Sequence, residues 1–318
     1  MKRPDLTDAL LAQKQIRPYL LRTPLHSYPA VDDLIGTRVF MKHENHQPTC
    51  AFKVRGGINL ISQLSPEERA SGVIAASTGN HGQSISYAAR LFGVTARIVV
   101  PEGANPGKVA SMRGMGADVI FHGANFDEAR LRCEKIAKDE GLRYVHSGDE
   151  PLLIAGVATV ALEMLEDQPD LEVLLVPVGG GSGAAGACIV ARAISPGIRV
   201  IGVQSERSPA ACESWRQRRL VEAPNRTHAE GLATGTAFSL PQSILWDLLD
   251  EFVLVSDDDI MRAMIWMIER AHTLAEGAGA AALAAAYGMK EQLAGKRVGL
   301  VCSGGNTSLT ELKRALEG

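Results

Sequence analysis

The chain has 318 residues, of which 46% are hydrophobic and 22% charged, and its formal net charge of −3 offers no basic field for a nucleic acid. Its five cysteines are odd in number and form no C-x-x-C pair, which argues against a disulfide framework or a zinc site. Neither a signal peptide nor an apolar run of about 18 residues occurs, so we expect a cytoplasmic protein without a membrane span.

Short apolar runs alternate with longer helical stretches along most of the chain. We expect strands, in chain order, at 72–76, 95–100, 117–121, 142–146, 171–178, 198–204 and 296–302. We expect helices at 80–92, 106–115, 125–140, 151–167, 183–194, 257–275, 279–288 and 308–316. The stretch 221–245, rich in turn residues, is expected to form a long loop. Because the strands carry Val and Ile on both faces, the pattern predicts parallel α/β sheets in two series, one before residue 147 and one after it.

One lysine stands in an unusual setting. Lys53 lies in the segment 48–57, among mostly small and apolar residues. A lysine in such a segment can simply extend its charged end to solvent. A desolvated lysine, in contrast, has a lowered pKa and can form a Schiff base with a carbonyl compound.

The turn at 77–82 reads Ser-Thr-Gly-Asn-His-Gly and follows the expected strand 72–76. In open α/β sheets, ligands bind where strands end and helices begin. Unpaired N–H groups at a helix start attract a carboxylate or a phosphate. The alternative is a plain N-cap, in which Ser77 or Thr78 satisfies the first turn of the helix.

The turn at 179–183 reads Gly-Gly-Gly-Ser-Gly and follows another expected strand. Successive glycines allow consecutive N–H groups to converge on one anion, which predicts a phosphate site. Tight packing of the strand against the helix is the alternative. Gly181, Gly183 and Gly186 also satisfy G-x-G-x-x-G, with Glu206 about 20 residues later, so a dinucleotide site is a competing interpretation.

Four motifs occur in order along the chain, namely P-T-x-x-F-K-x-R-G at 48–56, S-T-G-N-H-G at 77–82, G-G-G-S-G at 179–183 and S-G-G-N at 303–306. Together they resemble the fold-type II pyridoxal-phosphate (PLP) enzymes, most closely the branch of threonine/serine dehydratases and serine racemases. The resemblance extends from about Pro24 to Leu309.

The resemblance implies an α/β fold of two domains, like that of tryptophan synthase β, in which each domain is a mostly parallel sheet flanked by helices. It implies a large PLP-binding domain formed by residues 1–50 and 149–318, and a small domain formed by residues 51–148. Related enzymes act as dimers or tetramers, so we expect a homo-oligomer.

The resemblance also implies roles for individual residues. Lys53 would bind PLP as a Schiff base, Phe52 would pack beside the ring, Asn80 would bond the 3-hydroxyl and Ser303 the pyridine nitrogen. The residues implied to surround the cofactor phosphate are Gly179, Gly180, Gly181, Ser182 and Gly183. The residues implied to hold the substrate carboxylate are Ser77, Thr78 and His81. Further residues that match positions lining the cleft are Glu230, Gly231 and Glu276.

The chain departs from the pattern of its relatives at several positions. Ala51 replaces a serine that many relatives carry, and Ser182 replaces a glycine of the dehydratases. Gln204 stands where the racemase and several dehydratases have an acidic cation ligand, and its neighbours Ser208 and Ala210 are uncharged. We therefore expect no bound metal.

The reaction that the resemblance implies is PLP-dependent β-elimination from a small β-hydroxy amino acid such as threonine or serine, which gives a 2-keto acid and ammonia. Lys53 would act as the general base. A serine hydroxyl at position 303 is too weak an acid to protonate the pyridine, which favours elimination over transamination. Because the last expected helix ends near residue 316, we expect no effector-binding module and a catabolic role.

Three other interpretations stay open. The substrate can be a more specialised hydroxy amino acid, such as phenylserine, hydroxyaspartate or a hydroxyectoine-derived compound. Serine racemase activity is possible if Thr78 supplies an acid on the opposite face of Cα. The glycine fingerprint at 181–186, taken by itself, would suit a nicotinamide-dependent oxidoreductase.

Overall fold

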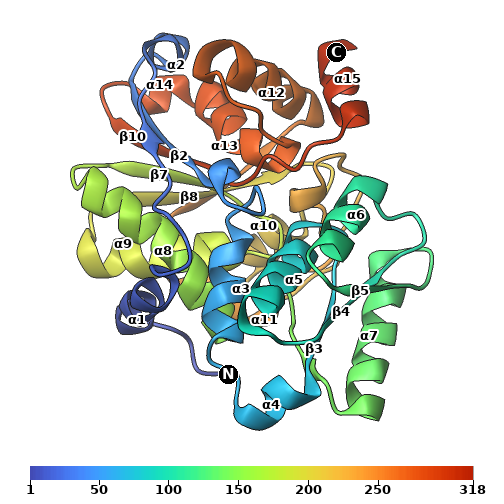
Figure 1. The fold of residues 1–318 in the computed structure, drawn as a ribbon. Helices are drawn as coiled ribbons and strands as arrows, with labels where there is room; N and C mark the ends of the chain where they lie inside the picture. The colour runs from blue at the N-terminus through green and yellow to red at the C-terminus, as the bar shows by residue number, and fades with distance from the viewer. Residues whose placement is uncertain (318) are drawn as a thin grey trace.

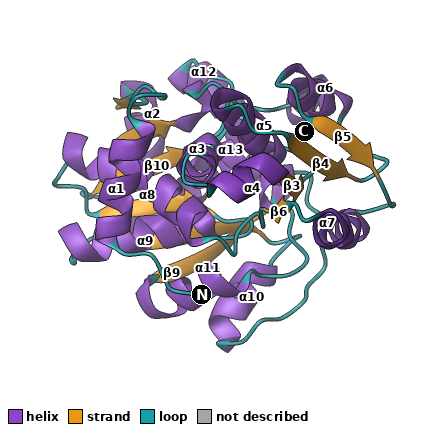
Figure 2. Cartoon of the chain, turned by 60° about the horizontal axis from the view of Figure 1, so that its bottom comes forward, coloured by secondary structure: helices purple, strands orange, loops and turns teal. Residues whose placement is uncertain are grey.

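The strands of the structure, a computed structural model that describes residues 1–317, pair into two separate sheets. The larger sheet has six strands in the order β1-β2-β10-β7-β8-β9, and the smaller has four in the order β5-β4-β3-β6. Helices flank both sheets, and Figure 1 shows the smaller sheet with α7 at the lower right, away from the larger one (Figures 1 and 2). An α/β fold with two domains is therefore confirmed, whereas the domain limits near residues 50 and 148 stay a prediction.

The larger sheet is parallel except at one edge, where β1 pairs antiparallel with β2. Its strands are β1 (Leu25–His26), β2 (Arg38–His43), β7 (Val173–Pro177), β8 (Arg199–Ser205), β9 (Glu251–Val255) and β10 (Arg297–Cys302). The helices of this half are α1 (Leu6–Ile16), α2 (Pro29–Ile35), α8 (Pro151–Asp167), α9 (Ser182–Ile194), α10 (Ala210–Gln217), α11 (Ser239–Leu248), α12 (Asp257–Ala271), α13 (Gly277–Gly288), α14 (Lys290–Leu293) and α15 (Leu309–Glu317).

Both faces of the larger sheet are buried, which explains why its strands are apolar throughout. Successive residues of β7 point to opposite faces. Leu175 packs into a core with α2, α12 and α13, and Val176 packs into a core with α8, α9 and α11.

The smaller sheet is parallel throughout and is also covered on both faces. Its strands are β3 (Val73–Ala76), β4 (Ala96–Val100), β5 (Asp118–Phe121) and β6 (Arg143–Tyr144), and its helices are α3 (Lys53–Ile61), α4 (Pro66–Ser71), α5 (Asn80–Phe92), α6 (Pro106–Gly114) and α7 (Phe126–Glu140). Ile74 and Val99 pack against α7, whereas Ala75 and Ile98 pack on the other face with α3, α5 and α6.

Helix α3 lies between the two halves, where it contacts both α5 and α8. A Cβ atom at Gly56 would stand 2.9 Å from the carbonyl oxygen of Leu153, and one at Gly156 would stand 2.7 Å from the Cα of Gly56. The backbones of α3 and α8 therefore touch without side chains between them. This close crossing leaves α3 little freedom to shift relative to the larger half.

Four charged residues, each with an exposed fraction of 7% or less, form an ion-pair cluster beside α3. The two outer nitrogens of Arg55 each lie 2.7 Å from a carboxylate oxygen, one of Glu44 and one of Glu163. Lys42 Nζ lies 2.6 Å from the second oxygen of Glu163. The hydroxyl of Thr23 donates to Glu44 at 2.6 Å. Two positive and two negative charges thus balance within the core.

Most expected elements occur within a few residues of their predicted bounds, but the helix expected at 257–275 ends at Ala271. His272 closes it in the left-handed conformation, with φ of +52°. The Asn45 amide then donates to Thr273 Oγ1 at 2.7 Å and to the carbonyl of Leu274 at 3.0 Å. A contact from a distant part of the chain therefore ends a helix that local propensity would continue.

The loop expected at 221–245 is also wrong in part, because α11 begins inside it at Ser239. The start of this helix is capped from far away in the sequence, since the Asp149 carboxylate accepts the backbone N–H of Leu240 at 2.7 Å. The strand expected at 142–146 is reduced to the two residues of β6. Elements that the pattern did not predict are α1, α2, α3, α4, α14, β1, β2 and β9.

No helix within residues 1–317 is both long and apolar enough to cross a membrane.

The Arg55 cluster predicts a large effect on stability. Arg55→Met should lower the free energy of unfolding by about 3–5 kcal/mol, because it leaves the buried Glu44 carboxylate without its charged partner. Equilibrium denaturation in urea measures this loss. Arg130→Met, which breaks the partly exposed Arg130–Glu134 pair of α7, is the control and should cost less than about 1 kcal/mol. Equal losses for the two variants would show that the cluster does not hold α3.

Candidate active site

The three unusual turns meet at the carboxyl ends of the strands, between the two sheets. The 77–82 turn follows β3, the 179–183 turn follows β7 and the 303–306 turn follows β10. Lys53 is the first residue of α3, and the residue before it is joined to the end of β10, because the Phe52 N–H donates to the carbonyl of Ser303 at 3.0 Å. Parallel strands thus bring motifs that are far apart in sequence to one place.

Lys53 is held in a setting that favours its uncharged form. Its Nζ donates to the Ser182 hydroxyl at 2.9 Å and to the carbonyl of Ser147 at 3.2 Å. Burial of the ammonium, without a carboxylate beside it in the described part of the chain, lowers the pKa of Lys53 to about 8. The alternative that Lys53 extends its charged end to solvent is therefore wrong.

The 179–183 turn forms a tight backbone cradle at the start of α9. Gly181 adopts φ of +90°, which only glycine takes without strain. A Cβ atom at Gly179 would stand 2.3 Å from the carbonyl oxygen of Gly231, and one at Gly180 would stand 2.2 Å from the Phe238 ring. The N–H groups at the start of this 13-residue helix are suited to an anion such as a phosphate.

Gly186, the last glycine of the G-x-G-x-x-G match, has a packing role. A Cβ atom there would stand 2.8 Å from the Cα of Ala158 in α8. The residue is therefore required for the contact between α8 and α9, whatever ligand the preceding turn binds.

The 77–82 turn is braced by its own side chains. The Ser77 hydroxyl accepts the N–H groups of Gly79 at 3.1 Å and Gly82 at 2.8 Å, as an N-cap residue would. His81 Nε2 donates to the carbonyl of Val145 at 3.2 Å, and burial together with the nearby Lys53 lowers the pKa of His81 to about 3. Both side chains hold the turn, while Thr78 is partly exposed. A substrate carboxylate would then meet Thr78 and backbone N–H groups, and this role stays a prediction.

Asn80 has its amide orientation fixed on two sides. Its Nδ2 donates to Glu276 Oε1 at 2.6 Å, and its Oδ1 accepts from Asn306 Nδ2 at 2.8 Å. Asn306 is anchored in turn, because it donates to the carbonyl of Thr49 at 2.8 Å. The second N–H of the Asn80 amide is thereby left to donate to a ligand. Asn306 was not among the predicted site residues, although the S-G-G-N motif contains it.

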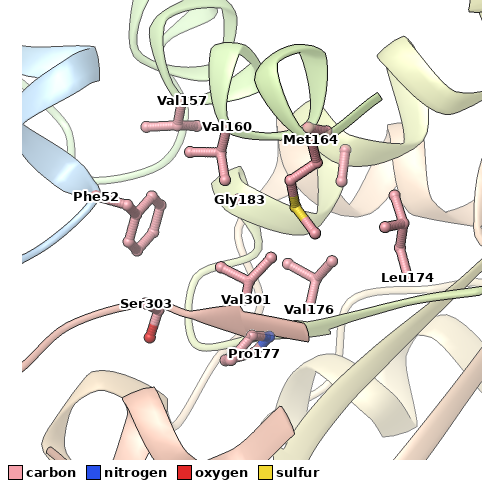
Figure 3. A pocket seen from close by; sticks show the side chains of 12 residues that line it. Phe52, Val157, Val160, Met164, Leu174, Val176, Pro177, Gly183, Val301 and Ser303 are labelled. Carbon is pink, nitrogen blue, oxygen red and sulfur yellow. The ribbon is translucent and has the colours of Figure 1, made fainter. Parts of the chain in front are cut away.

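Phe52 and Ser303 stand at the border of a buried apolar cavity. The cavity is lined by Phe52, Val157, Val160, Ala161, Met164, Leu174, Val176, Pro177, Gly183, Ala187, Val301 and Ser303. Figure 3 shows Phe52 and Ser303 at one end, with the Ser303 hydroxyl pointing away from Met164. A Cβ atom at Gly183 would stand 3.2 Å from the Phe52 ring. The Phe52 ring and the Ser303 hydroxyl thus lie at one edge of this apolar cavity, a setting that suits an aromatic ligand.

Lys108 is a site residue that sequence reasoning missed altogether. It lies in α6, and its Nζ reaches Glu230 Oε2 at 2.5 Å, beside the Asn80–Glu276 pair. A lysine inside an ordinary helix pattern carries no local signal of such a contact. The predicted cleft residues Glu230 and Glu276 do lie at this place.

Known proteins resemble this chain over nearly its whole length. Residues 16–304 match the family model of the pyridoxal-phosphate dependent enzymes. An L-threonine ammonia-lyase of Thermotoga maritima is 38% identical over 312 residues, which are 98% of this chain and 78% of that protein. A catabolic L-threonine dehydratase of Staphylococcus aureus is 39% identical over 318 residues, covering 98% of this chain and 92% of that protein. The structure of maize serine racemase aligns with a TM-score of 0.94 at 30% identity, covering 99% of this chain and 98% of that one.

The residues of the site fit PLP, the cofactor that this family model names. The pKa of Lys53 makes its amine available to bond a carbonyl carbon. The start of α9, directly after the 179–183 turn, offers unpaired N–H groups that suit a phosphate. Phe52 offers an aromatic face and Ser303 a hydroxyl beside it.

Cofactor capture should follow the titration of Lys53. Only the uncharged amine reacts with a carbonyl, so the rate at which cofactor-free protein binds PLP should rise with pH and level off above about 8. At pH 6 the uncharged fraction, and with it the rate, should be about a hundredfold lower. Stopped-flow absorbance after mixing with PLP measures the rate. A midpoint near 10.5, the ordinary value for lysine, would contradict the desolvated setting.

Proposed function

Because the chain belongs to the pyridoxal-phosphate dependent enzyme family, we propose that it removes water from L-threonine or L-serine and yields a 2-keto acid and ammonia. In this reaction the Cα–H and Cβ–O bonds of the substrate break and water leaves. Hydrolysis of the resulting enamine then gives the keto acid and ammonia. The names of the two L-threonine lyases, together with the 98% of this chain that each covers, support this substrate class.

The observation that carries the proposal is the placement of Lys53. Bound PLP delocalises the negative charge that remains on the substrate Cα after its proton leaves. Once the substrate amine has replaced it, Lys53 is the group that takes this proton. Ser182 and Ser147 keep its amine at the site, and a pKa of about 8 leaves part of it uncharged at neutral pH.

The other residues bind and orient. The 179–183 turn holds the cofactor phosphate through backbone N–H groups, and Asn80 donates to the cofactor's 3-hydroxyl. Ser303 donates to the pyridine nitrogen without protonating it. Thr78 and the backbone of the 77–82 turn hold the substrate carboxylate. These are the roles that the family resemblance implies, supported by the contacts described above.

Racemisation is a second candidate activity, favoured by the close structural match to maize serine racemase. It requires an acid on the face of Cα opposite Lys53. The partly exposed Thr78 is the candidate, and its methyl group limits its approach. We propose elimination as the main activity. A homo-oligomer and a cytoplasmic location are further parts of the proposal.

Reduction and product assays test the central claim together. Wild-type protein with PLP should absorb in the visible range, borohydride should bleach the band, and Lys53→Ala should lack it. L-Threonine or L-serine should yield keto acid at least about a thousandfold faster with wild type than with Lys53→Ala. Chiral analysis of the remaining amino acid measures racemisation in the same samples. A wild-type protein that binds PLP at Lys53 but forms no keto acid from either would refute the proposed substrates.

At the position where several relatives are expected to bind a cation, this chain has uncharged side chains that hydrogen-bond to one another and to the backbone. Gln204, fully buried, accepts the Cys212 N–H at 3.1 Å and faces Thr234 Oγ1 at 3.5 Å. The Ser208 hydroxyl donates to Asn225 Oδ1 at 2.7 Å. Hard divalent cations prefer carboxylates, and these side chains offer none. We propose that the enzyme needs no metal at this position.

Removal of divalent cations should therefore change little. Dialysis against a chelator should leave keto-acid formation within about twofold of the untreated enzyme. Gln204→Glu is the matched variant. It places a carboxylate where relatives bind the cation, so its melting temperature should rise with added Mg²⁺ or Ca²⁺. A loss of wild-type activity on chelation that either ion restores would contradict the proposal.

A further inference from the structure

Lys108 connects the two halves of the molecule. It lies in α6, beside the smaller sheet, and its partners belong to the larger half. Its Nζ lies 2.5 Å from Glu230 Oε2, in the short helix η2 (Glu230–Leu232), and 3.8 Å from Glu276 Oε2, directly before α13. The exposed fraction of Lys108 is only 8%, so this contact is unlike an ordinary surface ion pair.

The stem of Lys108 also covers the 77–82 turn. A Cβ atom at Gly79 would stand 3.1 Å from Lys108 Cδ and 3.4 Å from its Nζ. The methylene groups of Lys108 thus pack against the turn, while its ammonium extends past the turn to the larger half. An outward movement of α6 would pull the ammonium from Glu230.

The charges around Lys108 favour this bridge. Burial alone would lower the pKa of Lys108, but the attraction of Glu276 and Glu230 outweighs it and raises that pKa. Lys108 is therefore charged at neutral pH. Glu276 is buried and uses its other oxygen to accept from Asn80. The Lys108 ammonium thus supports the Glu276 carboxylate, which orients Asn80. The same ammonium pairs with the Glu230 carboxylate, whose side chain is 47% exposed.

We propose that Lys108 is a positioning residue, which fastens α6 and the 77–82 turn to the larger half through Glu230 and Glu276 and so holds the site closed around its substrate. The effect on catalysis rests on the proposed function. The attachment of α6 and the turn to the larger half does not rest on it. Lys108 acts through the turn and through Asn80, and it takes no proton from the substrate.

Hydrogen–deuterium exchange on the cofactor-free protein tests the fastening without any assay of activity. In Lys108→Met and in Glu230→Gln, amides of residues 77–82 and 106–114 should exchange at least about fivefold faster than in wild type. The double variant should exchange no faster than Lys108→Met, because each change removes the same contact. Glu230 is half-exposed, so Glu230→Gln gives a readout even if Lys108→Met fails to fold.

Steady-state kinetics on the holoenzyme test the positioning role. Both single variants should raise KM for the amino acid by about tenfold, with kcat within about threefold of wild type. Because Glu230 is partly exposed, salt should raise the KM of wild type but not that of Lys108→Met. Arg97→Met breaks the Arg97–Glu140 pair, which is more exposed and lies within the smaller half, and should change neither exchange at these residues nor KM.

The outcomes separate this inference from the proposed function. Unchanged exchange in both single variants, or additive effects in the double variant, would overturn the fastening. Faster exchange with an unchanged KM would overturn the positioning role. Faster exchange in a protein that forms no keto acid would refute the proposed substrates and leave the fastening in place.

Discussion

Burial of the Arg55 guanidinium between the carboxylates of Glu44 and Glu163 fixes the first turn of α3, and with it the amine of Lys53. Buried charges stabilise a fold little when compared with apolar side chains, but they are costly to misplace. The four-charge cluster therefore defines one position for α3 more than it strengthens the protein. The glycine crossing of α3 and α8 has the same effect through steric contact, because neither backbone can approach or tilt without a clash. Lys53, which we propose as the catalytic group, lies at the end of this rigid arrangement.

The site separates neutral groups from charged ones. Burial keeps His81 neutral and lowers the pKa of Lys53. Ser303 would offer the ring of the cofactor an uncharged hydroxyl. On the side of Asn80, the carboxylate of Glu276 lies near the ammonium of Lys108. Glu276 accepts one N–H of the Asn80 amide, and the other N–H is left to donate. A free carboxylate next to Lys53 would raise the pKa of its amine and remove the base. The charged residues are thus kept where they orient other groups and away from the proton transfer.

The sequence predicted those parts of the fold and site that depend on local pattern. The strand–turn–helix units at β3–α5 and β7–α9 occur almost where periodicity placed them, and they carry Asn80 and the glycine turn. Features set by distant residues were missed. Asp149 caps α11 from 91 positions away, and Lys108 meets Glu230 across 122 positions. Ser77 could not be assigned from its residue type, because a serine there fits both an N-cap and a substrate ligand. Its hydrogen bonds with the N–H groups of Gly79 and Gly82 reveal the capping role.

Ser303 connects the geometry to the choice of reaction. A serine hydroxyl donates a hydrogen bond to a pyridine nitrogen but does not give up its proton, whereas a carboxyl group would form an ion pair with the protonated ring. With Ser303 as the partner that we propose, the cofactor would withdraw electrons less strongly, and the charge left on Cα would be short-lived. A substrate with a β-hydroxyl can relieve that charge at once by expelling the hydroxyl. Return of a proton to the opposite face would compete with this step. Thr78, which is partly exposed and carries a methyl group on Cβ, would be a poor donor for it. A serine in this role would therefore favour elimination over slower reactions that start from the same charge on Cα.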